Sequence, residues 1–471
     1  MNAFTSGVMA ATTTKTLTGH ISPDQLYTFV YVPFDVPVGT TSVYVLQNYT
    51  EKGQGNSVDL GCFDQRGHDM LVGNASVGFR GWSGGFRNNF TISPVSATPG
   101  YVPGPIEPGQ WSVALGPYTS NPGGIDYELK VVLSSDPYEG DFTPDFAPSR
   151  VGADPAMTDH SDDEDSNVDK GSWYRGDLHL HTYYSDGEYA PQEIVDYAQR
   201  RDLDFFFSTD HNTQSSNLIW GSLAPPSLLI GRGMEVTTRN GHWGALGLEN
   251  WQWVDWRYTN NTNGLNAAKQ QVRDAGGFVS INHPYAACGA CNWTFPFNDF
   301  DGIEVWNSDW DPTDDMAVQE WQRMLVQGAN ITAVGGSDAH RAPQVIGLPT
   351  TVVRATGLST AAVLEGLKRR RAYLVRDPGM DIHFTVQTIG GVHTQVGDRI
   401  KVKGPAIARL QTTGMNNGTA TFFSQKGQLY QQVIKDGRDI THNLQGADWI
   451  RVEIRNATGS MLGLTNPIWL K

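Results

Sequence analysis

The stretch Arg175–Asp186, RGDLHLHTYYSD, decides how the rest of the chain is interpreted. It places His179 and His181 two positions apart in an apolar, strand-like run, and Asp186 on the turn that follows. Side chains at positions i and i+2 of a strand leave the same face, so both imidazoles can reach one metal ion. One His-X-His pair is a weak signal, and its weight comes from matching residues further along the chain.

The region 173–378 alternates apolar, strand-like runs with helical stretches. The strand-like runs are GDLHLHT, LDFFFSTDHN, SLLIGRGMEVTT, WGALGLEN, GFVSINHP, FDGIEVWNS and ITAVGGSDAH, and the helical stretches are PQEIVDYAQRRD, LNAAKQQVRDAG, AVQEWQRMLVQG and STAAVLEGLKRRR. Such alternation predicts an α/β fold with mainly parallel strands. A closed or distorted barrel suits it at least as well as an open sheet, and barrels carry their catalytic groups at the C-terminal ends of the strands.

Metal-binding residue types recur where these runs end. They are His179, His181 and Asp186, then Asp210 and His211, then Glu235, His242 and His283, and finally Asp338 and His340. Any one histidine at a strand end is more often a hydrogen-bonded loop residue, and a lone glutamate is usually a solvated rim charge. Six of the 12 histidines nevertheless fall at these positions. Mixed histidine and carboxylate ligands suit zinc, manganese or iron(II), and a carboxylate can bridge two ions, so we expect a multinuclear metal site.

The flanking regions are predicted to be β-rich. Residues 1–135 hold short β-rich runs separated by turn residues, which is typical of a β-sandwich accessory domain; GFRGWSGGFR and PGYVPGPIEPG within it are expected to be long loops. Residues 136–172 are Pro-rich and then acidic, and we expect a linker along the surface. Residues 379–471 return to β composition, with runs such as DIHFTVQTI, RIKVKG and WIRVEIRN, and predict a small C-terminal β module.

The charge and composition of the chain limit the classes of molecule that it is expected to bind. The net charge of −15 argues against a nucleic-acid partner and against docking on anionic membranes, but it leaves room for an anionic small-molecule substrate beside divalent cations. The sequence shows no signal peptide and no run of about 18 apolar residues that could span a membrane. Asn-X-Ser/Thr sequons, such as those at Asn48 and Asn417, would suit a secreted glycoprotein, so localisation stays open, as does the oligomeric state.

The three cysteines are too few for a disulfide framework. Cys288 and Cys291 form one CxxC pair, and no second such pair exists to complete the four ligands of a structural zinc site. A local disulfide or a chance spacing is therefore favoured over a zinc finger.

Residues 173–377 resemble the PHP (polymerase and histidinol phosphatase) superfamily. The resemblance lies in five motifs taken together: HLH with a following SDG, TDHN, a glutamate after the third strand, NHP and SDAH. With LYTFVYVPFDVP and PGYVPGPIEPGQW in front, the chain resembles the carbaryl-hydrolase-like (CehA/McbA-type) branch. The resemblance implies a distorted seven-stranded β/α barrel, flanked by the two β modules, with two or three divalent ions (Zn, Mn or Fe).

The resemblance also implies a division of the ligands. The first ion would be held by His179, His181, Glu235 and Asp338, which would position a metal-activated water and are the expected catalytic residues. Glu235 would bridge to a second ion at His283, with His242 as a further ligand or a substrate contact. Asp186, His211 and His340 would hold a third ion. Asp210 is expected to orient a neighbouring histidine.

The expected activity is hydrolysis by a metal-activated water, since no GxSxG nucleophile motif is present. A phosphoester is the preferred substrate, and a carbamate, carboxylic ester or amide is the alternative. A non-enzymatic alternative is a metal-containing but inactive binding or scaffold protein. Arg175, Asn212, Arg239 and Arg341 are candidate substrate contacts, because each lies beside a ligand motif. Trp243, Trp306 and Trp310 are candidates for an aromatic wall.

Overall fold

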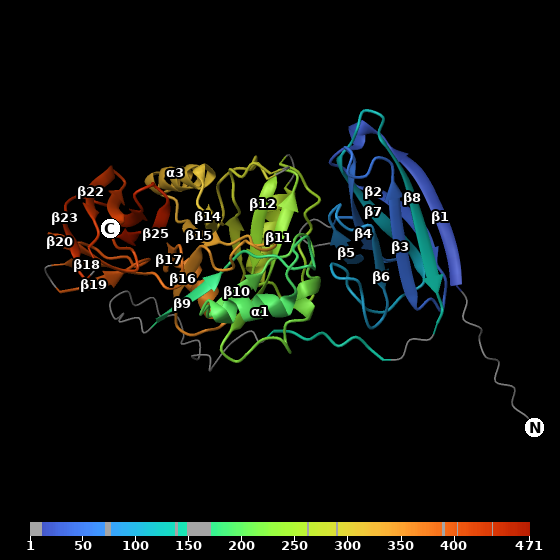
Figure 1. The fold of residues 1–471 in the computed structure, drawn as a ribbon, viewed down its shortest axis with the longest axis horizontal. Helices are drawn as coiled ribbons and strands as arrows, with labels where there is room; N and C mark the ends of the chain where they lie inside the picture. The colour runs from blue at the N-terminus through green and yellow to red at the C-terminus, as the bar shows by residue number, and fades with distance from the viewer. Residues whose placement is uncertain are drawn as a thin grey trace, which may run out of the picture.

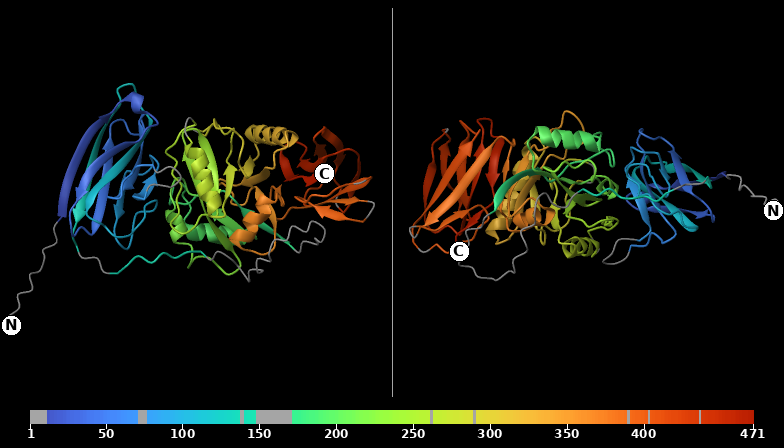
Figure 2. Two further views of the ribbon diagram at one scale, coloured as in Figure 1. Left: turned by 180° about the vertical axis from the view of Figure 1, so that it is seen from behind. Right: turned by 90° about the horizontal axis from the view of Figure 1, so that it is seen from below.

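The computed structural model describes residues 12–70, 77–136, 140–147, 171–260, 263–288, 291–388, 391–402, 404–435 and 437–471. Three parts follow one another along the long axis, from the blue N-terminal part through the green and yellow centre to the red C-terminal part (Figure 1). The two further views give the same order (Figure 2). The linker expected at 136–172 lies largely outside the described residues.

The N-terminal module, residues 12–136, consists of two four-stranded antiparallel sheets. One sheet has the order β1 (Thr12–Ile21), β8 (Ile125–Ser134), β3 (Ser42–Tyr49), β6 (Asn89–Ile92), and the other has the order β2 (Val30–Val36), β7 (Gly109–Thr119), β4 (Ser57–Phe63), β5 (Phe79–Ser83). Alternate residues of each strand point inward, so that Val43 and Val45 of one sheet share a core with Val113 and Leu115 of the other.

Strand β5 corrects one expectation, because it forms within GFRGWSGGFR, where a long loop was expected. All five of its residues are buried, and Leu60 of β4 pairs with Ser83. Gly81 adopts φ +129°, and a Cβ there would lie 2.4 Å from the Cα of Tyr101. The glycines that suggested a loop instead let another backbone segment cross close over a strand.

Aromatic side chains join the N-terminal module to the central part. Phe79 stacks on Trp253 with ring centroids 4.0 Å apart, and Trp82 meets Trp256 edge-on at 4.9 Å. Arg257 adds a hydrogen bond from Nη1 to the backbone oxygen of His68, 2.7 Å away. The two parts therefore share one apolar core and pack as a unit.

The central strands run in the order β15, β14, β13, β12, β11, β10, β9. Their bounds are β9 (Ser172–Asp177), β10 (Phe205–Ser208), β11 (Leu229–Thr238), β12 (Gly241–Leu246), β13 (Phe278–Ile281), β14 (Gly302–Asn307) and β15 (Thr332–Gly336). β9–β10–β11 and β13–β14–β15 are parallel, whereas β12 is antiparallel to both of its neighbours. The helices are α1 (Pro191–Arg200), α2 (Gly264–Asp274), α3 (Pro312–Val326) and α4 (Thr360–Lys368).

The two ends of this run of strands meet at the segments that follow β9 and β15. Leu180 forms a parallel bridge with Ala339, and the backbone N–H of Asp338 donates to the oxygen of His179 at 2.7 Å. The buried carboxylate of Asp177 accepts the backbone N–H groups of His179, Ser337 and Gly347. The sheet thus curls until the His-X-His segment lies beside the Ser-Asp-Ala-His segment.

The sheet does not stop at β9, and the expected seven-stranded barrel is not shown as a separate unit. Among the described residues it continues through β16 (Thr350–Ala355), β17 (Ala372–Val375), β25 (Met461–Thr465), β24 (Trp449–Arg455), β21 (Thr419–Ser424) and β22 (Gly427–Val433), with β26 (Ile468–Trp469) beside β24. The fold is mixed α/β and rich in strands. The continuation crosses the boundary expected at residue 378, because β17 pairs with β25.

A second C-terminal sheet covers this continuation. It has the order β19 (His393–Gln395), β18 (Asp381–Thr388), β20 (Ala406–Thr413), β23 (Ile440–Leu444), and shares an apolar core with β21 and β24. No strand forms over the described part of RIKVKG, residues 399–402 and 404, where one was expected. The N–H of Ile400 donates instead to the oxygen of Trp469 at 2.9 Å, so this segment packs as a loop along the chain end.

None of the helices in the described ranges combines the length and the apolar character that crossing a membrane would take.

Candidate metal centre

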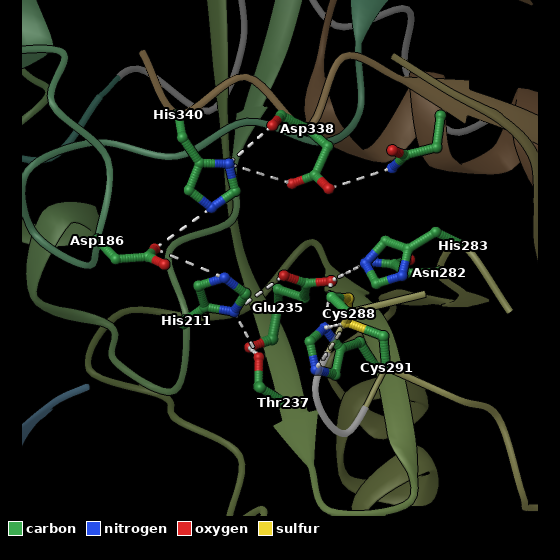
Figure 3. The surroundings of a disulfide bond; sticks show 12 residues. Asp186, His211, Glu235, Thr237, Asn282, His283, Cys288, Cys291, Asp338 and His340 are labelled. Atoms are coloured by element: carbon green, nitrogen blue, oxygen red, sulfur yellow. Dashed lines mark hydrogen bonds and ion pairs between the residues drawn. A yellow bond between two sulfur atoms is a disulfide. The ribbon is translucent and has the colours of Figure 1, made fainter. Parts of the chain in front are cut away.

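Glu235 lies at the centre of a cluster of histidines. It is fully buried on β11, and its Oε1 lies 3.0 Å from Nε2 of His283, 3.3 Å from Nε2 of His179 and 3.4 Å from Nδ1 of His242. Its Oε2 lies 2.9 Å from Nδ1 of His211. Figure 3 shows the rings of His211 and His283 meeting the carboxylate from different elements. One carboxylate therefore touches side chains from four segments of the central part.

A first group of donor atoms lies between β9 and β15. Oδ1 of Asp338 is 2.9 Å from Nε2 of His181 and 3.3 Å from Nε2 of His179, and Nε2 of His181 is 3.5 Å from Oε2 of Glu235. One donor atom from each of these four residues lies within 4.8 Å of the others. Four mixed nitrogen and oxygen donors at this spacing can surround one divalent ion.

A second group is formed around Asp186. Its Oδ1 lies 3.3 Å from Nε2 of His340 and 3.6 Å from Nε2 of His211, and His181 completes the group. Nδ1 of His340 lies 2.8 Å from the backbone oxygen of Asp338. Donation of the Nδ1 proton to that oxygen leaves the lone pair of Nε2 facing Asp186, as metal-binding histidines require.

The remaining expected ligands, His242 and His283, lie on the other side of Glu235. The structure thus gathers all nine residues expected as ligands into one cluster with Glu235 at its centre: His179, His181, Asp186, His211, Glu235, His242, His283, Asp338 and His340. His181 and Glu235 are common to two groups each. Their role as ligands stays a prediction, and their proximity is a property of the fold.

Two polar residues of the cluster were missed from the sequence. The buried Glu304 lies 3.1 Å from Nδ1 of His179 and accepts the N–H of His283 at 2.9 Å. Asn282 donates from Nδ2 to Oε1 of Glu235 at 3.1 Å. Each carried a signal in hindsight: Glu304 is a single carboxylate inside the apolar run GIEVW, and Asn282 precedes His283 in NHP.

Asp210 was expected to orient a histidine, and the structure gives it another task. Its two oxygens accept the backbone N–H and the hydroxyl of both Thr182 and Ser185, at 2.7 to 3.1 Å. Asp210 is completely buried. It therefore fixes the turn that carries Asp186, rather than an imidazole ring.

Most of the expected substrate contacts are engaged elsewhere. Arg175 bonds to the oxygen of Pro378 and pairs with Asp381, and Arg341 pairs with Glu188 on the surface. The side chain of Asn212 is clamped by the backbone N–H and oxygen of Thr237.

The aromatic wall is also corrected. Trp243 is fully buried and donates to the hydroxyl of Tyr258, and Trp306 is 1% exposed and donates to the oxygen of Ser308. Trp310 packs edge-on against Trp306 at 5.2 Å. Trp243 and Trp306 are core residues, because at most 1% of either side chain is exposed to a substrate.

Arg239 is held at the edge of the site by the N-terminal module. Its Nη2 lies 3.5 Å from Oδ2 of Asp59 on β4, and its guanidinium lies over the ring of Tyr118, 4.6 Å from the centroid. Burial raises the pKa of Asp59 to about 6; Arg239 opposes this rise, and the charges of Asp186 and His211 also act on Asp59. The pair therefore stands within electrostatic range of the second donor group.

Several buried polar atoms of the cluster form no hydrogen bond of good geometry within the described residues, although some of them lie within ion-pair distance of one another. They are Nε2 of His179, both ring nitrogens of His181, Nδ1 of His283, Oδ1 of Asp186, Oε2 of Glu235 and Oδ1 of Asp338. Buried polar atoms are normally satisfied, and leaving one unpaired costs about 1–3 kcal/mol. Divalent ions would satisfy these atoms together, so the residues present fit the implied metal.

The charges of the cluster also fit metal ions. Burial, together with the imidazoles of His340 and His211, lowers the pKa of His181 to about 3, which keeps its ring neutral and able to coordinate. Burial disfavours the charged form of His211 as well, but the carboxylates of Asp186 and Glu235 outweigh it and raise the pKa of that ring to about 9. Burial opposes ionisation of Glu235, yet His179 and His211 hold its pKa well below the usual range. The carboxylates concentrate negative charge in the site. Protons on the histidines balance this charge, and divalent cations can take the place of those protons.

No family model and no curated protein matches the chain. Among solved structures, it is similar to a two-domain protein of Bacteroides vulgatus containing a predicted PHP-like metal-dependent phosphoesterase: 18% identity over 64% of this chain and 97% of the other, TM-score 0.39. It is also similar to a candidate metal-dependent phosphoesterase of Bifidobacterium adolescentis, with 17% identity over 41% of this chain and 95% of the other and a TM-score of 0.27. An amidohydrolase of Chromobacterium violaceum with bound sulfate and no metal is similar with 16% identity over 43% of this chain and 97% of the other and a TM-score of 0.28.

Proposed function

We propose that this chain is a metal-dependent hydrolase that acts on a phosphoester bond of a small organic substrate. One observation carries the proposal: six histidines and two further carboxylates, Asp186 and Asp338, gather from separate segments around the buried Glu235, and several of their buried donor atoms form no well-directed hydrogen bond. Divalent ions held there supply activation of a water molecule and polarisation of the oxygen of the scissile group. We further propose that the seven strands from β15 to β9 act as the distorted barrel implied by the sequence resemblance, supported by the Leu180–Ala339 bridge.

The protein's own residues position these groups. Glu235 touches members of every donor group and can bridge neighbouring ions. Glu304 fixes the ring of His179 through Nδ1, which directs Nε2 toward Glu235 and Asp338. Asp177 and Asp210 hold the backbone segments that carry the His-X-His pair and Asp186. This rigid support keeps the donor atoms in place before any substrate enters.

The preference for a phosphoester comes from charge. Two or three divalent ions would make the site locally positive despite the chain's net charge of −15, which would suit an anionic substrate. Arg239 lies at the rim, and a guanidinium can fork onto phosphate oxygens. Because Arg239 is held by Asp59 and Tyr118, we propose that the N-terminal module takes part in substrate recognition.

The test is metal analysis followed by a substrate panel. The purified protein is assayed with bis(p-nitrophenyl) phosphate, p-nitrophenyl phosphate, 1-naphthyl methylcarbamate and p-nitrophenyl acetate. We expect bound divalent metal and phosphoester turnover, both lost in a His179→Ala/His181→Ala double variant. His20→Ala is the matched control, because this histidine is half-exposed on β1 and paired with Asp126.

The panel separates the competing functions. Turnover of the carbamate or the acetate alone would assign the chain to ester, carbamate or amide hydrolysis with the same metal site. Full metal content without turnover of any substrate would favour a binding or scaffold protein. Activity that survives the double substitution would contradict a role for the cluster.

A further inference from the structure

A disulfide lies against the metal cluster. Cys288 and Cys291 are bonded to each other, and Sγ of Cys291 lies 3.9 Å from Nε2 and 4.0 Å from Nδ1 of His242. Figure 3 draws the bond among the labelled residues of the cluster, which include Glu235 and His283. The two sulfurs have different surroundings, because Cys291 is 3% exposed whereas Cys288 lies on the surface. The buried sulfur faces the cluster and the exposed sulfur faces solvent.

The spacing suits a shared metal ion. One donor atom each of His242, His283 and Cys291 lies within 4.8 Å of the others. Zinc–nitrogen and zinc–sulfur bonds of about 2.0 and 2.3 Å in a tetrahedral site place the two donors about 3.5 Å apart. Nδ1 of His242 is the ring nitrogen that faces Glu235, and its distance of 4.0 Å from Sγ is about 0.5 Å above that value. A disulfide sulfur is a poor ligand, whereas a thiolate is a strong one.

We propose that reduction of the Cys288–Cys291 disulfide releases Cys291 as a ligand for an ion that His242, His283 and Glu235 hold. The proposal rests on the metal site of the proposed function and adds a fourth protein ligand that depends on the redox state. Glu235, His242 and His283 would leave one position of a tetrahedral ion open, as in catalytic sites. Cys291 would fill it, so the reduced protein binds that ion more tightly and turns over substrate more slowly.

The exchange uses a dithiol reductant and needs no other reactant. A thiolate of the reductant attacks the exposed Sγ of Cys288, the Cys288–Cys291 bond breaks, and Cys291 leaves with the electron pair as a thiolate. The second thiol of the reductant then attacks the reductant's own sulfur in the mixed disulfide and releases Cys288. The reductant departs as a cyclic disulfide after giving up two electrons. Of its two protons, one stays on Cys288 and the other passes to solvent.

The experiment uses the cobalt(II)-loaded full chain, since a thiolate bound to cobalt gives a charge-transfer absorption in the near ultraviolet. The protein is treated with dithiothreitol, desalted without oxygen and loaded with cobalt(II). We expect no such band in the oxidised wild type and a band of one thiolate per chain after reduction. Cys288→Ser leaves Cys291 without a disulfide partner, so this variant shows the band without reductant. Cys291→Ser never shows it.

Cys62→Ser is the matched control, because Cys62 is the third cysteine and is fully buried in the N-terminal module. This variant behaves as the wild type. If the reduced wild type and Cys288→Ser bind cobalt but show no band, Cys291 is not a ligand and the inference is overturned, while the metal site stands. If none of the forms binds cobalt, the metal site itself is overturned, and the inference with it.

Discussion

Gly336→Ala tests whether the contact between β15 and the His-X-His segment sets the metal geometry. A Cβ at this position would lie 2.4 Å from Cβ and 2.8 Å from the backbone nitrogen of His179. Ordinary contacts between carbon atoms begin near 3.5 Å, so the two segments must separate by about 1 Å. The hydrogen bond between the N–H of Asp338 and the oxygen of His179, 2.7 Å long, opposes that separation.

Two effects follow from this displacement. Overpacking of this kind costs about 1–3 kcal/mol in the free energy of unfolding. Metal sites tolerate ligand displacements of only about 0.2 Å, so a shift of His179 by about 1 Å removes the ion expected at His179, His181, Glu235 and Asp338. We therefore expect the variant to fold, to unfold at lower denaturant concentration, and to bind one metal equivalent fewer per chain.

The measurements are metal analysis after gel filtration and chemical denaturation monitored by tryptophan fluorescence. Gly123→Ala is the control, because it makes the same chemical change where no atom lies within 4 Å of the added Cβ. Wild-type metal content and stability in Gly336→Ala would refute the claim that this close approach positions His179.

Three further predictions concern single side chains. Asp186→Ala should lose one ion and leave the ion at His179 and His181 in place; metal analysis that finds the full complement, or none, would contradict the two-group arrangement. Trp256→Ala should lower the free energy of unfolding by about 3–5 kcal/mol and loosen the N-terminal module, because Trp256 is buried against Trp82; unchanged denaturation and unchanged proteolysis would disprove this. The buried carboxyl of Asp59 keeps its proton up to about pH 6, whereas the unfolded carboxyl loses it near 4, so its ionisation lowers stability as the pH rises between these values. Asp59→Asn should remove this decline and gain up to about 3 kcal/mol over wild type at pH 7; parallel stability curves from pH 4 to 7 would count against it.

The local elements were largely predictable from the sequence. The four helical stretches of the central region overlap α1 to α4, and each strand-like run there overlaps a strand. The expectation for the first run is wrong in one respect: β9 ends at Asp177, so His179 and His181 lie in the segment after the strand and not within it. Their signals are local, since amphipathic periodicity and flanking glycines act within about ten residues. The clustering of His211 and Glu235 was predictable for a related reason: the carboxyl ends of adjacent parallel strands meet at one edge.

The rest depends on contacts that local sequence does not encode. Glu304 contacts His179, which lies 125 positions away in the sequence, and nothing in the run GIEVW predicts that contact. The anchoring of Arg239 by Asp59 spans two modules, 180 positions apart. Trp243 and Trp306 are aromatic residues of the kind that line pockets, but both are buried. Their positions follow from how the sheet curls, which no single segment specifies.

The pairing of β17 with β25 has a consequence for how the chain can be divided. Tyr373 faces Thr465 and Leu374 faces Leu464 across this pair, and Nδ2 of Asn466 reaches the backbone oxygens of Ala333 and Ala372. A fragment that ends near residue 378 would leave β17 as an unprotected edge strand, and such edges recruit other chains into aggregates. Expression of the metal-binding part therefore needs the last ninety or so residues.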